Sequence, residues 1–509
     1  MRKPTDDLFR LIKSMTGPEK GYFKKMAEKS RKNDDNKYLK LFNVIDSVTG
    51  NKNYDESKIR EQFKGDILLN NLHVAKNYLY KIILKSLVQF HSENSSSIKI
   101  TDLYNRALIL YKKGLYKESQ IELTKCKNFI YKNSADEYLF PVLKLERFMI
   151  FSIFDSDRSD EFLKNSNEQI LAIEKMSNVI KYTGLFGKML HYNKGNPIMR
   201  EKEKTDMFEE IFKNSYLENE ESALTTESKI LFNKIYYNYY LALSDDKQLF
   251  YYSKKMISII ESNALHKNEF LHEYISILSG YLNSITFLKN YKEADDAIRK
   301  LKSIIVTSPY IDHLICITIY NFELIRFIQT GDFKEGIKLI PDIEKTIDEI
   351  EERKKMLRYK FSYSIAYLYF GAGKYEKTIE WLNKIFNENT TDMRQDILSF
   401  AHILNLISHF ELDNREYLFY TIKNTFRFLY KRNKLYKVEN AVMNFLRKTP
   451  NIISAKELIP HFAELKDNLI KITEDPYEMI AMDYFDFISW LESKIKGKEF
   501  AEIVKSKAN

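Results

Sequence analysis

The sequence is short of the residues that make turns and cross-links. Its 509 residues include 14 glycines, 9 prolines and 2 cysteines. β-Sandwiches and β-barrels need many turn residues, so this scarcity argues against them and favours helices joined by short loops. Cys126 and Cys316 stand far apart in the sequence. They predict no disulfide framework and cannot make a metal site by themselves.

Long apolar runs are also missing. No stretch of about 18 apolar residues, the length that a membrane span needs, occurs in the chain. The charged N-terminus, Met1 to Asp7, is not followed by an apolar segment, so no secretory signal is predicted. We therefore expect a cytoplasmic protein without membrane insertion.

Basic and acidic residues are present in nearly equal numbers, but they are not evenly distributed along the chain. The chain has 80 Lys and Arg against 71 Asp and Glu, a net charge of +9. Residues 1–100 hold 20 basic and 12 acidic residues, and residues 411–450 hold 9 and 4. The remainder is slightly acidic. The excess positive charge is therefore concentrated in residues 1–100 and 411–450, which the net charge of the whole chain does not reveal.

What the sequence does contain is an internal repeat. Aromatic residues stand 42 positions apart at Tyr291, Phe333, Tyr375 and Tyr417, and one step back gives Leu249. Most of these anchors follow a polar or glycine-containing turn. Apolar residues recur at fixed distances on either side of the first four anchors and fade at the fifth. Such a pattern predicts consecutive antiparallel helix hairpins that bury their apolar faces against one another.

The turns resemble those of the tetratricopeptide repeat, which places Gly, an aromatic and a small residue at the bend between its helices. The matching triplets are Gly331, Phe333 and Gly336; Gly373, Tyr375 and Thr378; and Gly114, Tyr116 and Ser119. The period departs from the family's usual 34, and the family's Trp is missing. Armadillo and HEAT repeats, with periods of about 40–47, remain an alternative. The resemblance implies an all-α superhelical solenoid of antiparallel hairpins.

Four regions follow from the patterns. Residues 1–95 are expected to form a basic helical N-terminal domain, which includes a capping box from Thr16 to Glu19 and helices over 36–47, 56–63 and 68–91. Residues 96–228 are expected to form irregular helical hairpins, of which the segment 102–135 resembles the tetratricopeptide repeat. The 42-residue repeats occupy 229–450. Residues 451–509 are expected to form a C-terminal helical cap, with helices over 454–471 and 477–496.

A ladder of polar positions runs through the predicted first helices. Two positions, 15 and 12 residues before each anchor, stay polar among apolar neighbours. In tetratricopeptide domains the matching face is concave and binds extended peptides. By this resemblance, the candidates for partner binding are Lys234, Tyr237, Asn283, Asn321, Lys360, Tyr363, His402, Asn405 and His409. Any surface helix has a polar face, so an ordinary solvated surface gives the same pattern.

Two basic patches are a second set of candidates. Lys423, Arg427, Lys431 and Lys434 fall on one predicted helical face, with Tyr420 and Tyr430 interleaved and Ile422, Phe426 and Leu429 opposite. The N-terminal patch spans 20–32 and includes Lys20, Lys24, Lys25, Arg31 and Lys32. Either patch suits phosphates or an acidic protein. Solvated basic faces are the simpler interpretation.

Signals for catalysis are weak. Gly371 to Lys374 resembles a fragment of a phosphate-binding loop, but Leu368 and Tyr375 replace the required Gly and Ser or Thr. The nine His form no metal-binding motif. We therefore predict no catalytic residues, no metal and no cofactor. The predicted function is a non-catalytic adaptor that binds a protein or peptide on the concave face. The alternative is a nucleic-acid- or ribosome-associated regulatory factor that uses the patches at 20–32 and 423–437.

Overall fold

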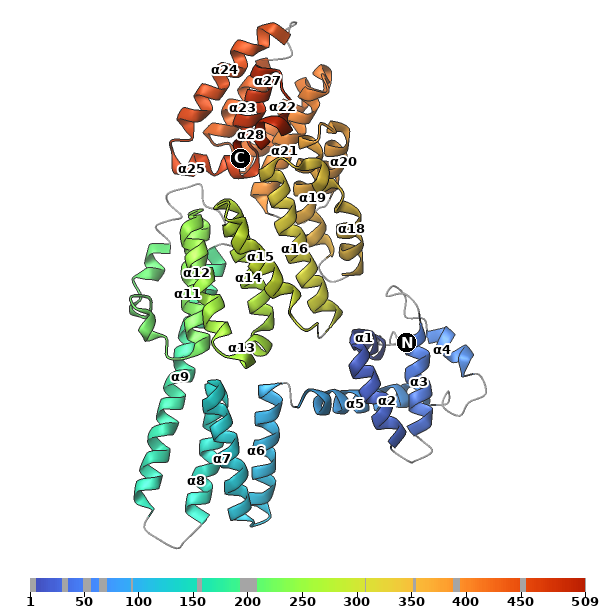
Figure 1. Cartoon of the computed structure of the whole chain (residues 1–509), viewed down its shortest axis with the longest axis vertical. Helices are drawn as coiled ribbons and strands as arrows, with labels where there is room; N and C mark the ends of the chain where they lie inside the picture. Colours follow the sequence, from blue (N-terminus) through green and yellow to red (C-terminus); the bar gives the residue numbers. More distant parts are fainter. Residues whose placement is uncertain are drawn as a thin grey trace.

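A computed structural model describes most of the chain (Figure 1). The described residues are 6–29, 35–48, 56–63, 71–92, 95–152, 158–192, 208–306, 308–350, 354–387, 394–448 and 455–508. Within these ranges the regular elements are helices, and no strand occurs. The prediction of an all-helical fold is confirmed.

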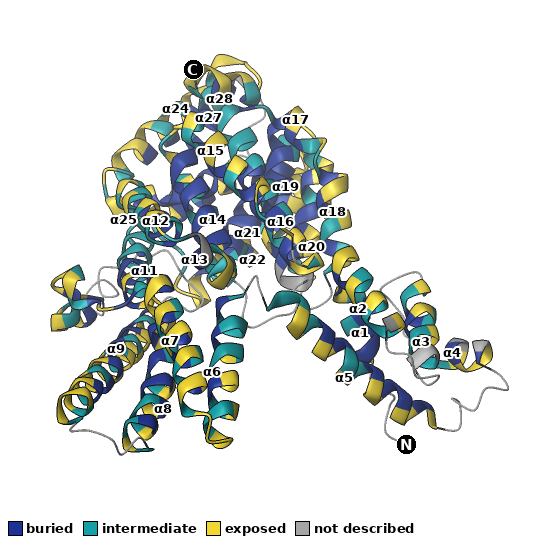
Figure 2. Ribbon diagram, turned by 60° about the horizontal axis from the view of Figure 1, so that its bottom comes forward, coloured by how far each residue is buried: buried dark blue, intermediate teal, exposed yellow. Residues whose placement is uncertain are grey.

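Five N-terminal helices form a group of their own at one side of the molecule (Figures 1 and 2). They are α1 (Asp7–Ser14), α2 (Gly17–Lys29), α3 (Asp35–Ser47), α4 (Glu56–Gln62) and α5 (Leu72–His91). Phe23, Phe42 and Ile83 lie in their common core. The predicted capping box is confirmed, because the Glu19 amide donates to Thr16 Oγ1 (3.4 Å) and the Thr16 amide donates to Glu19 Oε2 (2.6 Å).

The next helices form two long antiparallel pairs at the opposite end of Figure 1 from the C-terminus. They are α6 (Ser96–Lys112), α7 (Tyr116–Asn133), α8 (Leu139–Ser152) and α9 (Ser159–Tyr192). Gly114 makes the bend before Tyr116 with a φ of 75°, a conformation that costs glycine little. Ser119 is buried and its hydroxyl donates to the Ala107 carbonyl at 2.7 Å. The small residue therefore lets the two helices of this pair approach closely.

Five further hairpins follow. Their first helices are α11 (Thr226–Ala242), α14 (Leu271–Phe287), α16 (Pro309–Thr330), α19 (Lys354–Gly371) and α21 (Gln395–Glu411). Their second helices are α12 (Asp246–Glu261), α15 (Tyr291–Lys302), α17 with α18 (Phe333–Ile337 and Ile340–Glu349), α20 (Tyr375–Phe386) and α22 (Arg415–Lys431). The short helix α13 (Ala264–Glu269) precedes α14. Buried residues dominate α14 and α21, as Figure 2 shows.

The turn of each hairpin contains a residue with positive φ. Lys289, Gly331 and Gly373 have φ values of 56°, 75° and 72° and stand 42 residues apart. The helices after them begin at Tyr291, Phe333 and Tyr375, as the repeat predicts. The outer turns differ, because their left-handed residues are Ser244 and Asp413. Leu249 and Tyr417 consequently lie inside α12 and α22, and a single register over five turns is wrong at both ends.

The C-terminal helices fold back onto the hairpins. They are α23 (Lys437–Lys448), α24 (Ala455–Ile472), α25 (Pro476–Met479), α26 (Ala481–Tyr484), α27 (Phe487–Lys496) and α28 (Phe500–Ala508). The ring of Phe500 stacks on Phe333, with centroids 5.6 Å apart. Lys505 Nζ lies 2.8 Å from Asp332 Oδ1, beside the turn before α17. The C-terminal segment is therefore part of the core of the later hairpins.

The prediction of a single helix over 477–496 is wrong, because α25, α26 and α27 occupy this range. The chain leaves the helical conformation at Phe485, whose φ and ψ are −152° and 132°. Asp486 then caps α27 by accepting a hydrogen bond from the Ser489 amide at 2.8 Å. A capping Asp starts a new helix, and sequence periodicity does not register such a break.

A substitution at Gly371 tests how tightly the hairpins pack. A Cβ at this position would overlap the ring of Phe333, a side chain that is buried against Phe500. Gly371→Ala is expected to destabilise the protein by about 1–3 kcal/mol, because the core must shift to relieve the overlap. Urea unfolding of the whole chain measures the change.

Gly184→Ala is the matched control, since nothing lies within 4 Å of its added Cβ in α9. Replacing a glycine inside a helix at an open position is expected to stabilise by about 0.5–1 kcal/mol. Equal effects of the two substitutions would contradict the packing described for Phe333.

Candidate functional site

The predicted polar ladder lies along the first helices, where most of its members contact other parts of the chain. Lys234 Nζ on α11 lies 3.4 Å from Glu273 Oε1 on α14, and the Tyr237 hydroxyl packs against Gly280 of α14. Asn321 Nδ2 on α16 donates to Asn283 Oδ1 on α14 at 3.0 Å. These contacts join neighbouring first helices, so this part of the ladder serves to hold them together.

Further along, the C-terminal helices cover part of the ladder. The buried Tyr363 hydroxyl on α19 donates to the Tyr484 carbonyl at 3.0 Å, and burial raises its pKa well above the usual range. Lys360 keeps access to solvent. The surrounding protein and the charge of Arg394 nevertheless lower the pKa of Lys360 to about 8. Lys360 is thus exposed, whereas Tyr363, one helical turn further along the ladder, is covered by the C-terminal helices.

The three candidates on α21 lie among side chains of the same chain. His402 is sandwiched between Phe386 and Phe428, with centroid distances of 4.4 and 4.3 Å, and burial lowers its pKa to about 4. His409 Nδ1 lies 3.1 Å from Asn414 Nδ2 at the turn before α22. Asn405 is buried, and its Oδ1 has no hydrogen-bond partner within the described residues. A role of these residues toward a partner stays a prediction.

The N-terminal basic patch is partly neutralised. Lys20 Nζ lies 2.7 Å from Asp46 Oδ1, and Lys24 Nζ lies 3.9 Å from the other carboxylate oxygen. Lys25 is exposed. Arg31 and Lys32, which complete the predicted patch, lie outside the described residues. The described part of this patch therefore offers little unpaired charge.

Helix α22 differs, because its outward face combines cations and aromatic rings. Lys423, Arg427 and Lys431 are exposed, and none of them has an ion pair within the described part of the chain. Phe419, Tyr420 and Tyr430 are 71%, 72% and 68% exposed. We call this set, with the three cations, the α22 face. Large exposed apolar side chains grouped on one face mark interaction sites more often than singly scattered ones do.

Two predictions about this helix need correction. Lys434 does not continue the stripe, because α22 ends at Lys431 and Asn433 turns the chain with a φ of 52°. Lys434 Nζ instead lies 5.9 Å from the centroid of Tyr436. Phe426, expected on the buried side, is 39% exposed and stacks on Tyr430. Ile422 and Leu429 are buried as predicted.

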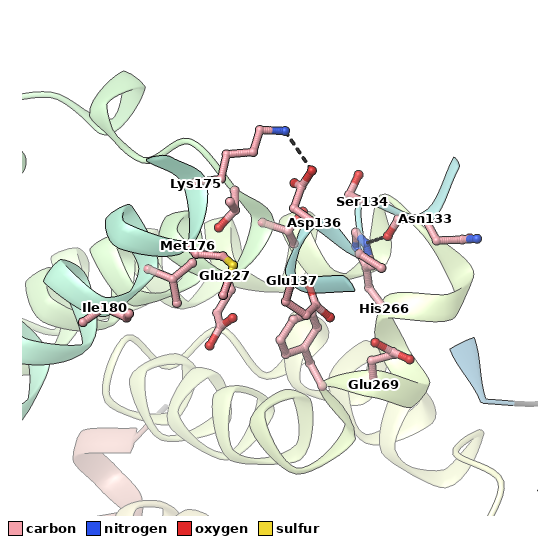
Figure 3. Close-up of a pocket in the computed structure, with 15 residues that line it drawn as sticks. Asn133, Ser134, Asp136, Glu137, Lys175, Met176, Ile180, Glu227, His266 and Glu269 are labelled. Atoms are coloured by element: carbon pink, nitrogen blue, oxygen red, sulfur yellow. Dashed lines mark hydrogen bonds and ion pairs between the residues drawn. The ribbon is translucent and has the colours of Figure 1, made fainter. Parts of the chain in front are cut away.

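A cavity of about 160 Å³ lies where four segments meet, and the sequence did not point to it (Figure 3). Its walls come from the end of α7 and the 3₁₀ turn Asp136–Tyr138, from α9, from the start of α11, and from α13. Ser134, in the left-handed conformation with a φ of 52°, turns the chain between α7 and the 3₁₀ segment. These residues are widely separated in sequence and share no periodic pattern, so only the folded chain brings them together.

The cavity is rich in carboxylates. Figure 3 shows Glu137 between Glu227 and Glu269 in this view, and each of the three side chains has access to solvent. Burial raises the pKa of Glu137 to about 6, and the neighbouring carboxylates of Glu269, Glu227 and Asp136 add to the rise. The cation at this site, Lys175, is already paired with Asp136, with Nζ and Oδ1 2.8 Å apart.

His266 closes one side of the cavity. Its Nε2 lies 2.9 Å from the Asn133 carbonyl oxygen, so this nitrogen must carry a proton and donate. The side chain is only 6% exposed, and its Nδ1 has no hydrogen-bond partner among the described residues. Val179, Ile180, Met176 and Phe270 supply an apolar wall. The cavity therefore combines acceptors, negative charge and an apolar surface.

Among the described residues, no three His, Cys, Asp or Glu side chains form a group that suits a metal ion. None of the helices in the described ranges is long and apolar enough to cross a membrane. No family model matches the chain, and comparisons with curated proteins and with solved structures find no match either.

The raised pKa of Glu137 predicts a pH-dependent effect of Glu137→Gln. A carboxyl whose folded pKa lies above its unfolded value contributes stability below about pH 4.5 that is lost as the pH rises through 6. The variant is therefore expected to unfold at a higher temperature than the wild type at pH 7.5 and at no higher temperature at pH 4.5. Thermal denaturation at both pH values measures the difference.

Glu174→Gln provides the comparison, since Glu174 is exposed on α9 and does not line the cavity. This control is expected to change the midpoint by the same small amount at both pH values. A Glu137→Gln effect that is independent of pH would show that the crowding of carboxylates in this cavity is not energetically important.

Proposed function

We propose that the chain is a non-catalytic binding protein, an adaptor that holds an acidic protein segment on the α22 face. The observation that carries this proposal is the combination of three cations that have no ion pair among the described residues with three aromatic side chains that are each more than two-thirds exposed. Tyr, Phe and Arg are enriched at the centres of protein interfaces. The cations select an anionic partner, and the rings supply contact area with little loss of side-chain entropy.

The ladder in the first helices supports an adaptor less directly. Tyr363, His402 and Asn321 already contact side chains or backbone of the chain itself, so a ligand there would have to displace these contacts. Lys360 is exposed, and Lys234 is half-buried and paired with Glu273. We therefore propose α22 as the main recognition surface, in place of the concave face that the sequence pattern suggests.

We further propose that the hairpins form a solenoid of the tetratricopeptide type. The support is the interval of 42 residues between the left-handed turn residues Lys289, Gly331 and Gly373, together with contacts between successive first helices. Stacked hairpins would hold α22 rigid, so that a flexible partner alone loses conformational entropy on binding. A cytoplasmic location also stays a proposal, for which two unpaired cysteines are the support.

A second candidate is binding of single-stranded nucleic acid, which the spacing on α22 favours. Lys423, Arg427 and Lys431 follow one another at intervals of about one helical turn, roughly 6 Å. Exposed rings beside such cations can stack on bases. In the first candidate the aromatic rings contact a protein, and in the second they contact nucleic-acid bases. Treatment with a nuclease distinguishes the two, because it removes only the nucleic acid.

The test is capture from a lysate of the native host by the full chain and by a triple variant, Lys423→Glu, Arg427→Glu and Lys431→Glu. We expect the variant to lose the captured protein, and the loss of affinity for the purified partner to be at least about tenfold, because like charges replace a complementary set. Nuclease treatment is expected to leave capture by the wild type unchanged.

The control carries the same charge change at three exposed lysines elsewhere, Lys117→Glu, Lys164→Glu and Lys188→Glu. It is expected to bind the partner as the wild type does. Equal capture by all three proteins would rule out the α22 face. Loss of capture after nuclease treatment would favour the nucleic-acid alternative.

A further inference from the structure

A second cavity, of about 400 Å³, lies between α18, α19 and α20, which are neighbours in Figure 1. Small-molecule sites in proteins commonly measure about 300–1,000 Å³ and combine an apolar wall with a few polar groups. The inner wall of this cavity is apolar, because the buried side chains of Tyr359, Phe361 and Trp381 line it. Ile347 and Ile365 complete this wall. The cavity therefore has the size and the apolar surface of a site for a small molecule.

The edge of this cavity is rich in hydrogen-bond donors. Arg358 and Lys384 are exposed there, and Glu344 is the one acid among the described residues that line the cavity. Arg358 Nη2 donates to Asp348 Oδ1 at 2.6 Å, and Lys384 Nζ donates to Glu344 Oε1 at 3.3 Å. A guanidinium group has five donor hydrogens and an ammonium group has three. Both cations therefore keep donors that these two bonds do not use.

Neither ion pair holds its cation firmly. The four side chains are 43–51% exposed, and ion pairs at this exposure contribute little because water screens them. The two acids, Glu344 and Asp348, stand one turn apart on α18, roughly 6 Å. The cations paired with them are therefore near enough for one ligand to reach both, and a bound anion can share or replace either carboxylate.

Trp381 determines where the ammonium group of Lys384 lies. Nζ of Lys384 is 3.2 Å from the centroid of the Trp381 ring, and the face of an aromatic ring attracts a cation at such a distance. Trp381 itself lines the cavity. The ammonium group is therefore held at the boundary between the apolar wall and the polar edge.

We propose that this cavity binds a small carboxylic acid that carries an apolar body. The carboxylate accepts charge-assisted hydrogen bonds from Arg358 and Lys384, and the apolar body lies against Phe361, Ile365 and Trp381. The charges favour an anion, since two cations and one acid line the described part of the cavity. The site shares no residue with the α22 face and takes a small molecule, so the proposal goes beyond the adaptor function and is tested independently of it.

Tryptophan fluorescence can report on this cavity directly, because the chain has only two tryptophans. Trp490 is buried in the C-terminal helices against Phe410, Phe445 and Phe462. A ligand in the cavity displaces the ammonium group from the ring of Trp381. Binding is therefore expected to change the emission of Trp381 and to leave that of Trp490 unchanged.

The experiment is titration of the full chain with hexanoate and with hydrocinnamate, followed by fluorescence and by calorimetry. Acetate lacks the apolar body, and hexanamide and hydrocinnamide lack the charge. We expect a saturable change with at least one of the two apolar acids, and none with acetate or the amides over the same concentrations. In Trp381→Phe the fluorescence change is expected to disappear while calorimetry still detects binding.

Failure of both apolar acids to bind would overturn the proposal. Binding of acetate or of an amide as tight as that of the apolar acids would overturn it too, because one half of the proposed ligand would then play no part. A fluorescence change that persists in Trp381→Phe would show that the acid binds elsewhere.

Variants at the edge of the cavity test the roles of the charges. Arg358→Gln with Lys384→Gln is expected to bind the acid about tenfold more weakly or worse, because charge-assisted hydrogen bonds are lost. Glu344→Gln is expected to bind up to about fivefold more tightly, since the competing partner of Lys384 is removed. The control, Arg299→Gln with Lys377→Gln, changes two exposed and paired cations that do not line the cavity.

This control and the α22 triple variant are expected to bind the acid as the wild type does, which separates the present proposal from the adaptor function. Equal binding by the Arg358 and Lys384 double variant would overturn the proposal. Weaker binding by Glu344→Gln would also overturn it, because the acid and not the cations would then hold the ligand.

Discussion

Aromatic packing between segments that are distant in sequence is the constraint on which the later part of the molecule depends. Phe333, Phe370, Phe485 and Phe500 come from α17, α19, the residue after α26, and α28, and their rings lie 5.2–5.9 Å apart. No hairpin here can bury its apolar side alone, so each needs its neighbour or the returning C-terminal helices. Gly371 is required at the closest point of this cluster, because any side chain would meet the Phe333 ring.

This packing determines which surfaces remain for recognition. The returning helices reach the first helices, where Asp486 donates its amide hydrogen to the Tyr367 hydroxyl at 3.0 Å and Trp490 Nε1 donates to Glu411 Oε1 at 2.7 Å. Polar groups of the first helices thus find partners inside the chain. Within the described ranges no such contact reaches the outer side of α22, and its cations and rings are exposed. A partner that binds there needs no rearrangement of the core.

The sequence predicted much of the local structure. Turns at Gly114, Gly331 and Gly373, helix starts at Tyr291, Phe333 and Tyr375, and the capping box at Thr16 all depend on residues close together in the chain. It could not predict that 476–508 returns to α16 and α19, because that depends on side-chain fit over more than a hundred residues. For the same reason it placed His402 and Tyr363 on an open face, and it gave no sign of the cavity between Glu137, Glu227 and His266.

The most direct test of the account is amide hydrogen exchange of the full chain with and without its captured partner. The account predicts that exchange slows in α22, residues 415–431, while α19 and residues 476–508 exchange as in the free protein, since the core is already closed. Slower exchange in α19 together with faster exchange in 476–508, and no change in α22, would contradict it. That result would mean that the C-terminal helices give way and that the partner binds on the first helices.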